Sequence, residues 1–360
     1  IHGVVDVSSI SYLQKFSRKK RVFQQPVKSK FNNTTSVIIN MNKKNGIWIT
    51  WEHQRRNSGI CSSLNFRLYE LNFTHHMIIR YAKCICLTVK IIFNQKPKIV
   101  VVQNPSILLP LIANLLKTFL NFKVVMDAHN SGIFPCEGKY SMLMMISKFL
   151  QKTSDLTLVT NKYLARIVFE NGGNPFILPD KIPQVTSQKQ FVLNNRPSIA
   201  YICTFRADEP YREVIYAAKL LDNKVDIYFT GNYGSKLNSI NIPSNVILLG
   251  YLKEEDYWAL LAAADLIMDL TLRENCLVCG AYEAVALNKP LILSNTEALK
   301  NYFYKGCIYV SSSATIIAEG IIKAFLNLDE LRLETVEMHN EINNRWGKKV
   351  LILKKRLNHL

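Results

Sequence analysis

The segment RENCLVCGAYEAVALNKPLILS, residues 273–294, contains the most informative pattern in this chain of 360 residues. It predicts a loop, a helix, a tight turn and a buried strand. The helix ends before Pro290, because the residue preceding a proline is disfavoured in the α region. The strand 291–293 is wholly apolar, as expected when both of its faces are covered. The unpaired amides at such a helix start bind anions. Glu274 lies at the start of the helix and Glu283 within it, where a carboxylate could hold sugar hydroxyl groups. The segment therefore predicts a seat for a nucleotide diphosphate.

Apolar strand-like runs alternate with helix-like runs on both sides of this segment. They form two series, with strands expected at 47–51, 98–102, 123–126 and 156–159, and at 198–202, 225–229, 246–249 and 266–270. This alternation predicts parallel sheets with right-handed crossovers. The expected fold class is therefore α/β, with two doubly wound Rossmann-like domains that face one cleft.

Changes in composition mark the expected boundaries. The first part of the chain is basic and poorly periodic, and we expect a disordered or non-native leader before Met41. The proline-containing stretch 175–197 suits a linker. The predicted leader spans 1–40, the N-terminal domain 41–185 and the C-terminal domain 186–335. A final basic helix spans 336–360, and we expect it to pack back on the N-terminal domain.

The chain has a net charge of +18, with basic residues concentrated before Met41 and within 345–356. Such fields attract nucleic acid or anionic lipid, and each basic residue near an anionic bilayer contributes about 1 kcal/mol. No nucleic-acid-binding signature is recognisable, so we expect no nucleic-acid partner and consider an anionic membrane surface as a partner. Solvated helix faces are the alternative explanation for the C-terminal charges.

Metal, redox and membrane-spanning classes have little support. Cys276 and Cys279 form the only CxxC pair, and no Asp-x-Asp pair occurs. We therefore expect no metal and no cofactor. The longest apolar run, 107–122, carries Lys117, whose burial in a bilayer would cost about 2.5–3.5 kcal/mol. We expect a cytoplasmic protein, with peripheral attachment to the inner face of the membrane as an option.

Ligands of doubly wound sheets bind beyond the carboxyl ends of the strands, so the residues just after strands are the site candidates. These residues resemble those of GT-B-fold glycosyltransferases of the group that includes family 4, especially bacterial enzymes of surface polysaccharide or glycolipid assembly. The similarity extends over about 47–325 and comprises Trp51-Glu-x-x-Arg-Arg, Asn104-Pro, Asp127-Ala-His, Asp208-Glu-Pro, Gly250-Tyr-Leu and Ala263-Ala-Asp. The resemblance implies metal-independent transfer of a sugar from a nucleotide diphosphate sugar to a glycan or lipid-linked acceptor.

The resemblance assigns the donor to the C-terminal domain. Glu283 matches the second of two glutamates that the family carries eight positions apart, and is expected to hold the donor ribose. Asn275 stands eight positions before Glu283 and Glu274 nine, so Glu274 takes the first place only with a one-residue loop insertion. Glu274 is kept as a catalytic candidate. The expected donor-binding residues are Arg206, Gly231, Arg273, Asn275, Leu277, Val278 and Glu283.

The acceptor is assigned to the N-terminal domain. His129 resembles a histidine that points at the donor sugar, and Asp127 is expected to orient it or to cap the following loop. A structural histidine is the alternative. We expect the acceptor to contact His53, Arg55 and Arg56. The alternative is that these charged side chains are only solvated residues of a loop. Competing functions are a GT-B epimerase or phosphorylase, a catalytically silent homologue, and a basic nucleic-acid-binding protein.

Overall fold

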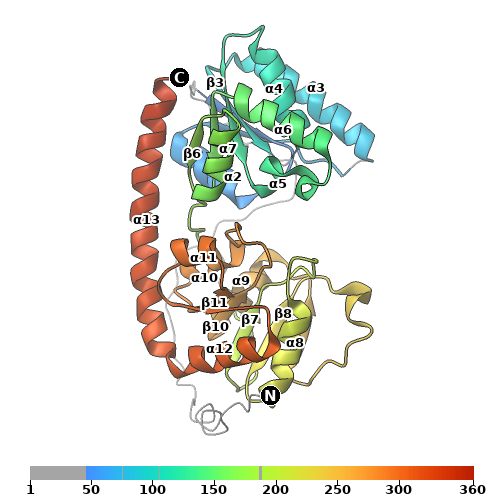
Figure 1. Ribbon diagram of the computed structural model, residues 1–360, viewed down its shortest axis with the longest axis vertical. Helices are drawn as coiled ribbons and strands as arrows, with labels where there is room; N and C mark the ends of the chain where they lie inside the picture. Colours follow the sequence, from blue (N-terminus) through green and yellow to red (C-terminus); the bar gives the residue numbers. More distant parts are fainter. Residues whose placement is uncertain (1–45, 75, 105, 186–188) are drawn as a thin grey trace. The chain divides into compact units, whose positions relative to one another are not determined.

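The computed structural model describes residues 46–360 except 75, 105 and 186–188. The predicted leader at 1–40 lies outside the described residues. Two compact units are present (Figure 1). The N-domain comprises 46–181 and 344–360, and the C-domain comprises 182–343. The predicted boundaries were 185/186 and 335/336. The second one differs because the final helix is continuous and contributes one half to each domain.

The N-domain contains a parallel sheet in the order β2-β1-β3-β4-β5-β6. Its strands are β1 Gly46–Thr50, β2 Arg67–Glu70, β3 Ile99–Asn104, β4 Lys123–Ala128, β5 Leu156–Val159 and β6 Pro175–Ile177. The prediction missed β2, and it placed β6 in the linker 175–197. Both are short edge strands with little apolar signal, and β6 begins with a proline, which edge strands tolerate.

Helices cover both faces of the N-domain sheet, as the alternation along β3 shows. Val100 and Val102 pack in one apolar core and Val101 in the other. The first face is covered by α3 Met77–Gln95, α4 Leu108–Lys117, α6 Ser141–Thr153 and α7 Lys162–Glu170. The second is covered by α2 Arg55–Leu64 and the last part of α13 Leu328–Asn358. The short helices α5 Asn130–Ile133 and η2 Pro135–Gly138 follow β4.

The C-domain repeats this plan with a parallel sheet in the order β12-β11-β10-β7-β8-β9. The strands are β7 Ser198–Tyr201, β8 Asp226–Thr230, β9 Val246–Gly250, β10 Leu266–Asp269, β11 Leu291–Ser294 and β12 Cys307–Val310. One face carries α8 Tyr211–Leu220 and α12 Ala314–Leu326; the other carries α9 Glu254–Ala263, α10 Cys279–Ala286 and α11 Glu297–Tyr302. The short helix η3 Gly234–Leu237 follows β8.

Helix α13 contributes to both domains. Met338 and Ile342, in its first half, pack in a C-domain core. Trp346 and Val350, in its second half, pack in an N-domain core, and the Trp346 indole N–H donates to the Pro179 carbonyl oxygen at 3.0 Å. Many basic residues at the end of the chain therefore lie on a helix that is anchored to the N-domain by its apolar side. No described helix is both long enough and apolar enough to cross a bilayer.

The strand orders define one switch point in each domain. In the N-domain, α2 leaves β1 for one face of the sheet and α4 leaves β3 for the other. In the C-domain, α8 leaves β7 for one face and α10 leaves β10 for the other. Connections that diverge in this way open a crevice at the carboxyl ends of the two strands, where doubly wound sheets bind their ligands.

Candidate functional site

At the C-domain switch point, the loops that follow β7 and β10 are tied together. The Leu272 amide donates to the Asp208 carbonyl oxygen at 2.7 Å. The Arg273 guanidinium Nε lies 3.0 Å from the Asp208 carboxylate. The structure therefore brings Arg273 beside the loop that carries Arg206. The Arg206 side chain is exposed.

The loop after β7 is organised by Glu209. Its carboxylate accepts hydrogen bonds from the Thr204 amide at 2.8 Å, the Arg206 amide at 3.0 Å and the Thr204 hydroxyl at 2.8 Å. Lys236 donates to the Phe205 carbonyl oxygen at 2.7 Å. Glu209 thus shapes the loop, and Lys236, which the sequence analysis missed, places an ammonium group at the same loop.

Gly231 follows β8 and has a left-handed backbone, with φ of +88°. A Cβ atom at this position would clash with the Cys203 carbonyl oxygen. Only glycine fits such a close approach of two backbone segments without strain. Gly231 therefore lets the loops after β7 and β8 approach each other, and its role in donor binding stays a prediction.

Asp269, at the end of β10, is joined to the start of α10. Its carboxylate is buried and accepts a hydrogen bond from the Gly280 amide at 2.8 Å. Burial raises the pKa of Asp269 well above its usual range, and the nearby carboxylates of Glu283 and Glu209 raise it further, although the Gly280 amide opposes them. A Cβ atom on Gly280 would clash with this carboxylate. The Gly280 amide is thus already bonded to Asp269. The amides of Leu277 and Val278, the predicted donor-binding residues, belong to the segment just before α10.

The two glutamates of the motif have different surroundings. Glu283 is buried within α10, and its carboxylate accepts a hydrogen bond from the Tyr257 hydroxyl of α9. Glu274 is exposed in the turn before α10, and Asn275 is partly buried in the same turn. The carboxylates of Glu209 and Glu283 thus lie near that of Asp269 at the switch point. The sequence analysis identified only Glu283 among them. A single Asp at the end of an apolar strand was the signal for Asp269.

In the N-domain, Arg56 and Asp127 form a buried ion pair. Arg56 Nε lies 3.0 and 3.1 Å from the two Asp127 oxygens, and Arg56 Nη1 lies 2.5 Å from Asp180. Burial opposes the charged form of Arg56, but the two carboxylates outweigh it and raise the pKa of the guanidinium. Arg56 is therefore a buried partner of Asp127, not an exposed residue available to an acceptor phosphate. The sequence analysis, which predicted that Arg56 contacts the acceptor, missed this pairing because Arg56 and Asp127 are 71 positions apart in the chain.

His129 lies in the first loop residues after β4. Its Nε2 is 3.8 Å from the nearest Asp127 oxygen, which is longer than a hydrogen bond. Because the Asp127 carboxylate is bonded to Arg56, it is not the close orienting partner that the sequence predicted. His129 Nε2 is buried and has no hydrogen-bond partner among the described residues. Buried polar atoms normally have partners, so the missing partner keeps His129 a candidate site residue.

The N-domain switch point itself contains an amide cluster that the sequence analysis missed. Gln103, at the end of β3, accepts hydrogen bonds from the Thr50 hydroxyl at 2.5 Å and the Asn57 amide at 2.9 Å. Its signal was a polar residue closing an apolar strand. Of the other predicted acceptor residues, His53 pairs with Glu70 at 3.0 Å, and Arg55 is exposed at the start of α2. No three described His, Cys, Asp or Glu side chains are grouped as a metal ion would require.

The chain matches no family model and no curated protein sequence. Its fold is similar to that of HepE from Anabaena, solved with UDP-glucose, with a TM-score of 0.65 at 11% identity over 87% of this chain and 98% of that one. A glycosyltransferase from Rickettsia africae gives a TM-score of 0.61 at 11% identity over 88% and 99%. A putative UDP-N-acetylglucosamine 2-epimerase from Listeria monocytogenes gives 0.55 at 11% identity over 88% and 98%. At these identities the similarity shows the fold. The predicted α/β class, with two doubly wound GT-B-type domains, is confirmed.

Proposed function

We propose that this protein is a glycosyltransferase that moves a sugar from a nucleotide diphosphate sugar to a glycan or lipid-linked acceptor. The observation that carries the proposal is Glu283, a buried carboxylate fixed by Tyr257 at the C-domain switch point. A carboxylate held in place beside a helix start suits the hydroxyl groups of a ribose whose diphosphate lies at the helix N-terminus. The similarity in fold to a glycosyltransferase and to a protein solved with UDP-glucose supports the same reading.

In this proposal, the C-domain loops bind the diphosphate. The exposed guanidinium of Arg206 and that of Arg273 provide positive charge, and the amides of Leu277 and Val278 donate at the helix start. Gly231 permits backbone close to the ligand, and Asn275 contacts the donor from the turn before α10. Arg273 is already paired with Asp208, so it shares its charge between that carboxylate and the diphosphate. Arg206 therefore provides the larger part of the neutralisation.

The reaction breaks the bond between the anomeric carbon and the diphosphate oxygen, and the diphosphate keeps the electron pair. The sugar carbon passes through an oxocarbenium-like state, by analogy with glycoside hydrolysis. Arginines and amides placed around the leaving group stabilise its developing charge without reorganising. The acceptor oxygen forms the new bond to the same carbon and releases its proton. His129, whose Nε2 has no hydrogen-bond partner among the described residues, remains a catalytic candidate in the N-domain. Asp127 fixes the loop that carries it, and Glu274 remains a catalytic candidate on the exposed turn.

Calorimetric titration with UDP, GDP and their sugars tests the donor site. We expect saturable binding of one nucleotide, weakened about 100-fold in Glu283→Ala because a charged hydrogen-bond acceptor is lost. The matched control is Glu319→Ala, which removes an exposed glutamate from α12 of the same domain. No binding of any nucleotide diphosphate by the wild-type chain, or equal binding by the two variants, would contradict the proposal.

A nucleotide-sugar epimerase is the second candidate, because the fold is also similar to that of a putative 2-epimerase. An epimerase converts its nucleotide sugar without any acceptor. A transferase releases the nucleotide diphosphate and forms a new glycosidic bond. Proton NMR of the donor, incubated with the protein in the absence of acceptor, separates the two. An epimerised nucleotide sugar with no nucleotide released would favour the epimerase.

A further inference from the structure

The N-domain helices α3, α4 and α6 expose an unusual number of large apolar side chains. The helices cover one face of the sheet, where α4 contacts both neighbours (Figure 1). Phe119 is 84% exposed, Ile78 70% and Met145 69%. The full set of exposed apolar residues on these helices and their flanks is Met77, Ile78, Ile79, Phe93, Leu108, Leu115, Phe119, Tyr140, Met142, Met145 and Phe149. Large exposed apolar side chains gathered on neighbouring helices indicate an interaction surface.

The same layer is strongly basic. No Asp or Glu occurs between Glu70 and Asp127, a stretch that includes α3 and α4. The basic residues in that stretch are Arg80, Lys83, Lys90, Lys96, Lys98, Lys117 and Lys123. Helix α6 adds Lys148 and Lys152 and has no acidic residue. Lys117 and Lys123 pair with Asp155, which precedes β5. The other positive charges of this surface are not balanced by acidic residues within its own helices.

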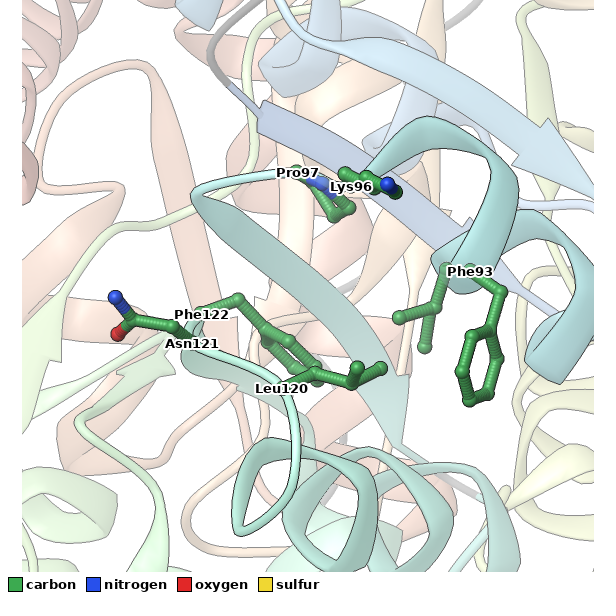
Figure 2. A pocket seen from close by; sticks show the side chains of 7 residues that line it. Phe93, Lys96, Pro97, Leu120, Asn121 and Phe122 are labelled. Atoms are coloured by element: carbon green, nitrogen blue, oxygen red, sulfur yellow. The ribbon is translucent and has the colours of Figure 1, made fainter.

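A pocket lies at the edge of this layer, between the end of α3 and the loop before β4 (Figure 2). It has a volume of about 260 Å³ and is lined by Ile92, Phe93, Lys96, Pro97, Leu120, Asn121 and Phe122. Figure 2 shows the side chains of Phe93 and Leu120 at the pocket, with Lys96 on the adjoining backbone. Apolar lining beside an ammonium group matches the chemistry of an anionic lipid, which combines a charged headgroup with hydrocarbon.

We propose that the outward side of α3, α4 and α6, here called the basic apolar face, docks on an anionic lipid bilayer. Exposed aromatic and methionine side chains enter the headgroup region, as in interfacial helices, and the lysines contact the anionic headgroups. A second copy of the chain fits this face poorly, because pairing it with itself would bring two basic surfaces together. The proposal does not depend on the reaction that the protein catalyses.

The basic apolar face is distinct from the basic C-terminal run, one of the two basic regions for which the sequence analysis considered attraction to a membrane. The C-terminal part of α13 packs on the opposite face of the same sheet. It provides matched controls, because Leu351 and Ile352 are 61% and 57% exposed there and Lys354 and Lys355 are also exposed. The two basic regions can therefore be tested separately in one protein.

Cosedimentation of the full chain with phosphatidylcholine vesicles, with and without phosphatidylglycerol, tests the proposal. We expect binding only with phosphatidylglycerol. The charge variant Lys90→Glu/Lys148→Glu should weaken it at least 30-fold, because two attractive charges become repulsive. The apolar variant Phe119→Ser/Met145→Ser should weaken it at least tenfold. Two independent variants keep the test valid if circular dichroism shows that one of them is unfolded.

The controls Lys354→Glu/Lys355→Glu and Leu351→Ser/Ile352→Ser should bind within about threefold of the wild type. The charges of the first 40 residues are the same in every variant. Equal binding to neutral and anionic vesicles would overturn the proposal, as would controls that weaken binding as much as the face variants do. So would a dimeric mass by light scattering that becomes monomeric in Phe119→Ser/Met145→Ser, since the face would then bind a second copy.

Discussion

The two switch points are built in different ways. In the C-domain, the carboxylates of Glu209 and Asp269 are held by backbone amides, and Gly231 lets two loops approach closely. In the N-domain, the charges of Arg56 and Asp127 neutralise each other through their side chains. The shape of the first site therefore depends on the backbone, and that of the second on Arg56 and its two carboxylate partners, Asp127 and Asp180. Glycine substitutions should damage the first, and charge deletions should damage the second.

The largest expected effect is that of Arg56→Ala. Removal of the guanidinium leaves the Asp127 carboxylate buried without its partner, which should lower the free energy of unfolding by about 3–5 kcal/mol. Urea unfolding followed by tryptophan fluorescence measures this effect. Arg55→Ala is the control, because the adjacent arginine is exposed and its loss should cost less than about 1 kcal/mol. Similar losses in both variants would show that the buried pair does not hold the N-domain site together.

Gly231→Ala should have the next largest effect. The new Cβ atom clashes with the Cys203 carbonyl oxygen and the backbone is left-handed, so we expect a loss of about 2–3 kcal/mol. Nucleotide affinity should fall with it, since the loop moves. The control is Gly234→Ala, at a φ of +47° with no atom within 4 Å of the added Cβ, where only the backbone term of about 1 kcal/mol applies. If both variants unfold at the same urea concentration, the close approach at Gly231 has no energetic role.

Asp269→Asn should change the pH dependence of stability. The pKa of Asp269 is raised in the folded state, so folding favours the protonated carboxyl. Its contribution to stability is therefore present below the unfolded pKa of about 4, and is lost as the pH rises through the folded pKa. The amide cannot ionise, so the stability of the variant should fall less than that of the wild type as the pH increases. Thermal unfolding between pH 4 and pH 9 provides the comparison, and parallel curves would argue against a protonated Asp269.

The smallest expected effect is that of Tyr257→Phe, which removes the hydroxyl that donates to Glu283. Loss of this hydrogen bond should cost about 1 kcal/mol and should weaken nucleotide binding roughly fivefold, because Glu283 is no longer held in one orientation. Tyr251→Phe is the control, since Tyr251 is in the same domain and is 84% exposed. Unchanged affinity in Tyr257→Phe would mean that Glu283 is positioned by other contacts.

The sequence predicted the parts of this structure that depend on local pattern. The apolar strands, the helix carrying Glu283 and the turn before Pro290 follow from periodicity and proline chemistry. The edge strands β2 and β6 were missed because they have only four and three residues, mostly half-buried, and so show little hydrophobic pattern. The contact between Arg56 and Asp127 was missed because it joins residues far apart in the chain. For the same reason, the sequence could not show that Tyr257 holds Glu283 or that Asp269 uses the Gly280 amide.

The central claim is that a nucleotide diphosphate binds at the C-domain switch point. Hydrogen–deuterium exchange of the full chain with and without saturating UDP or GDP tests it most directly, because each peptide reports on its own loop. The account predicts slower exchange in peptides that cover 203–209, 231–236 and 271–283. Protection confined to N-domain peptides such as 50–57 and 127–133, or no protection by either nucleotide, would contradict it.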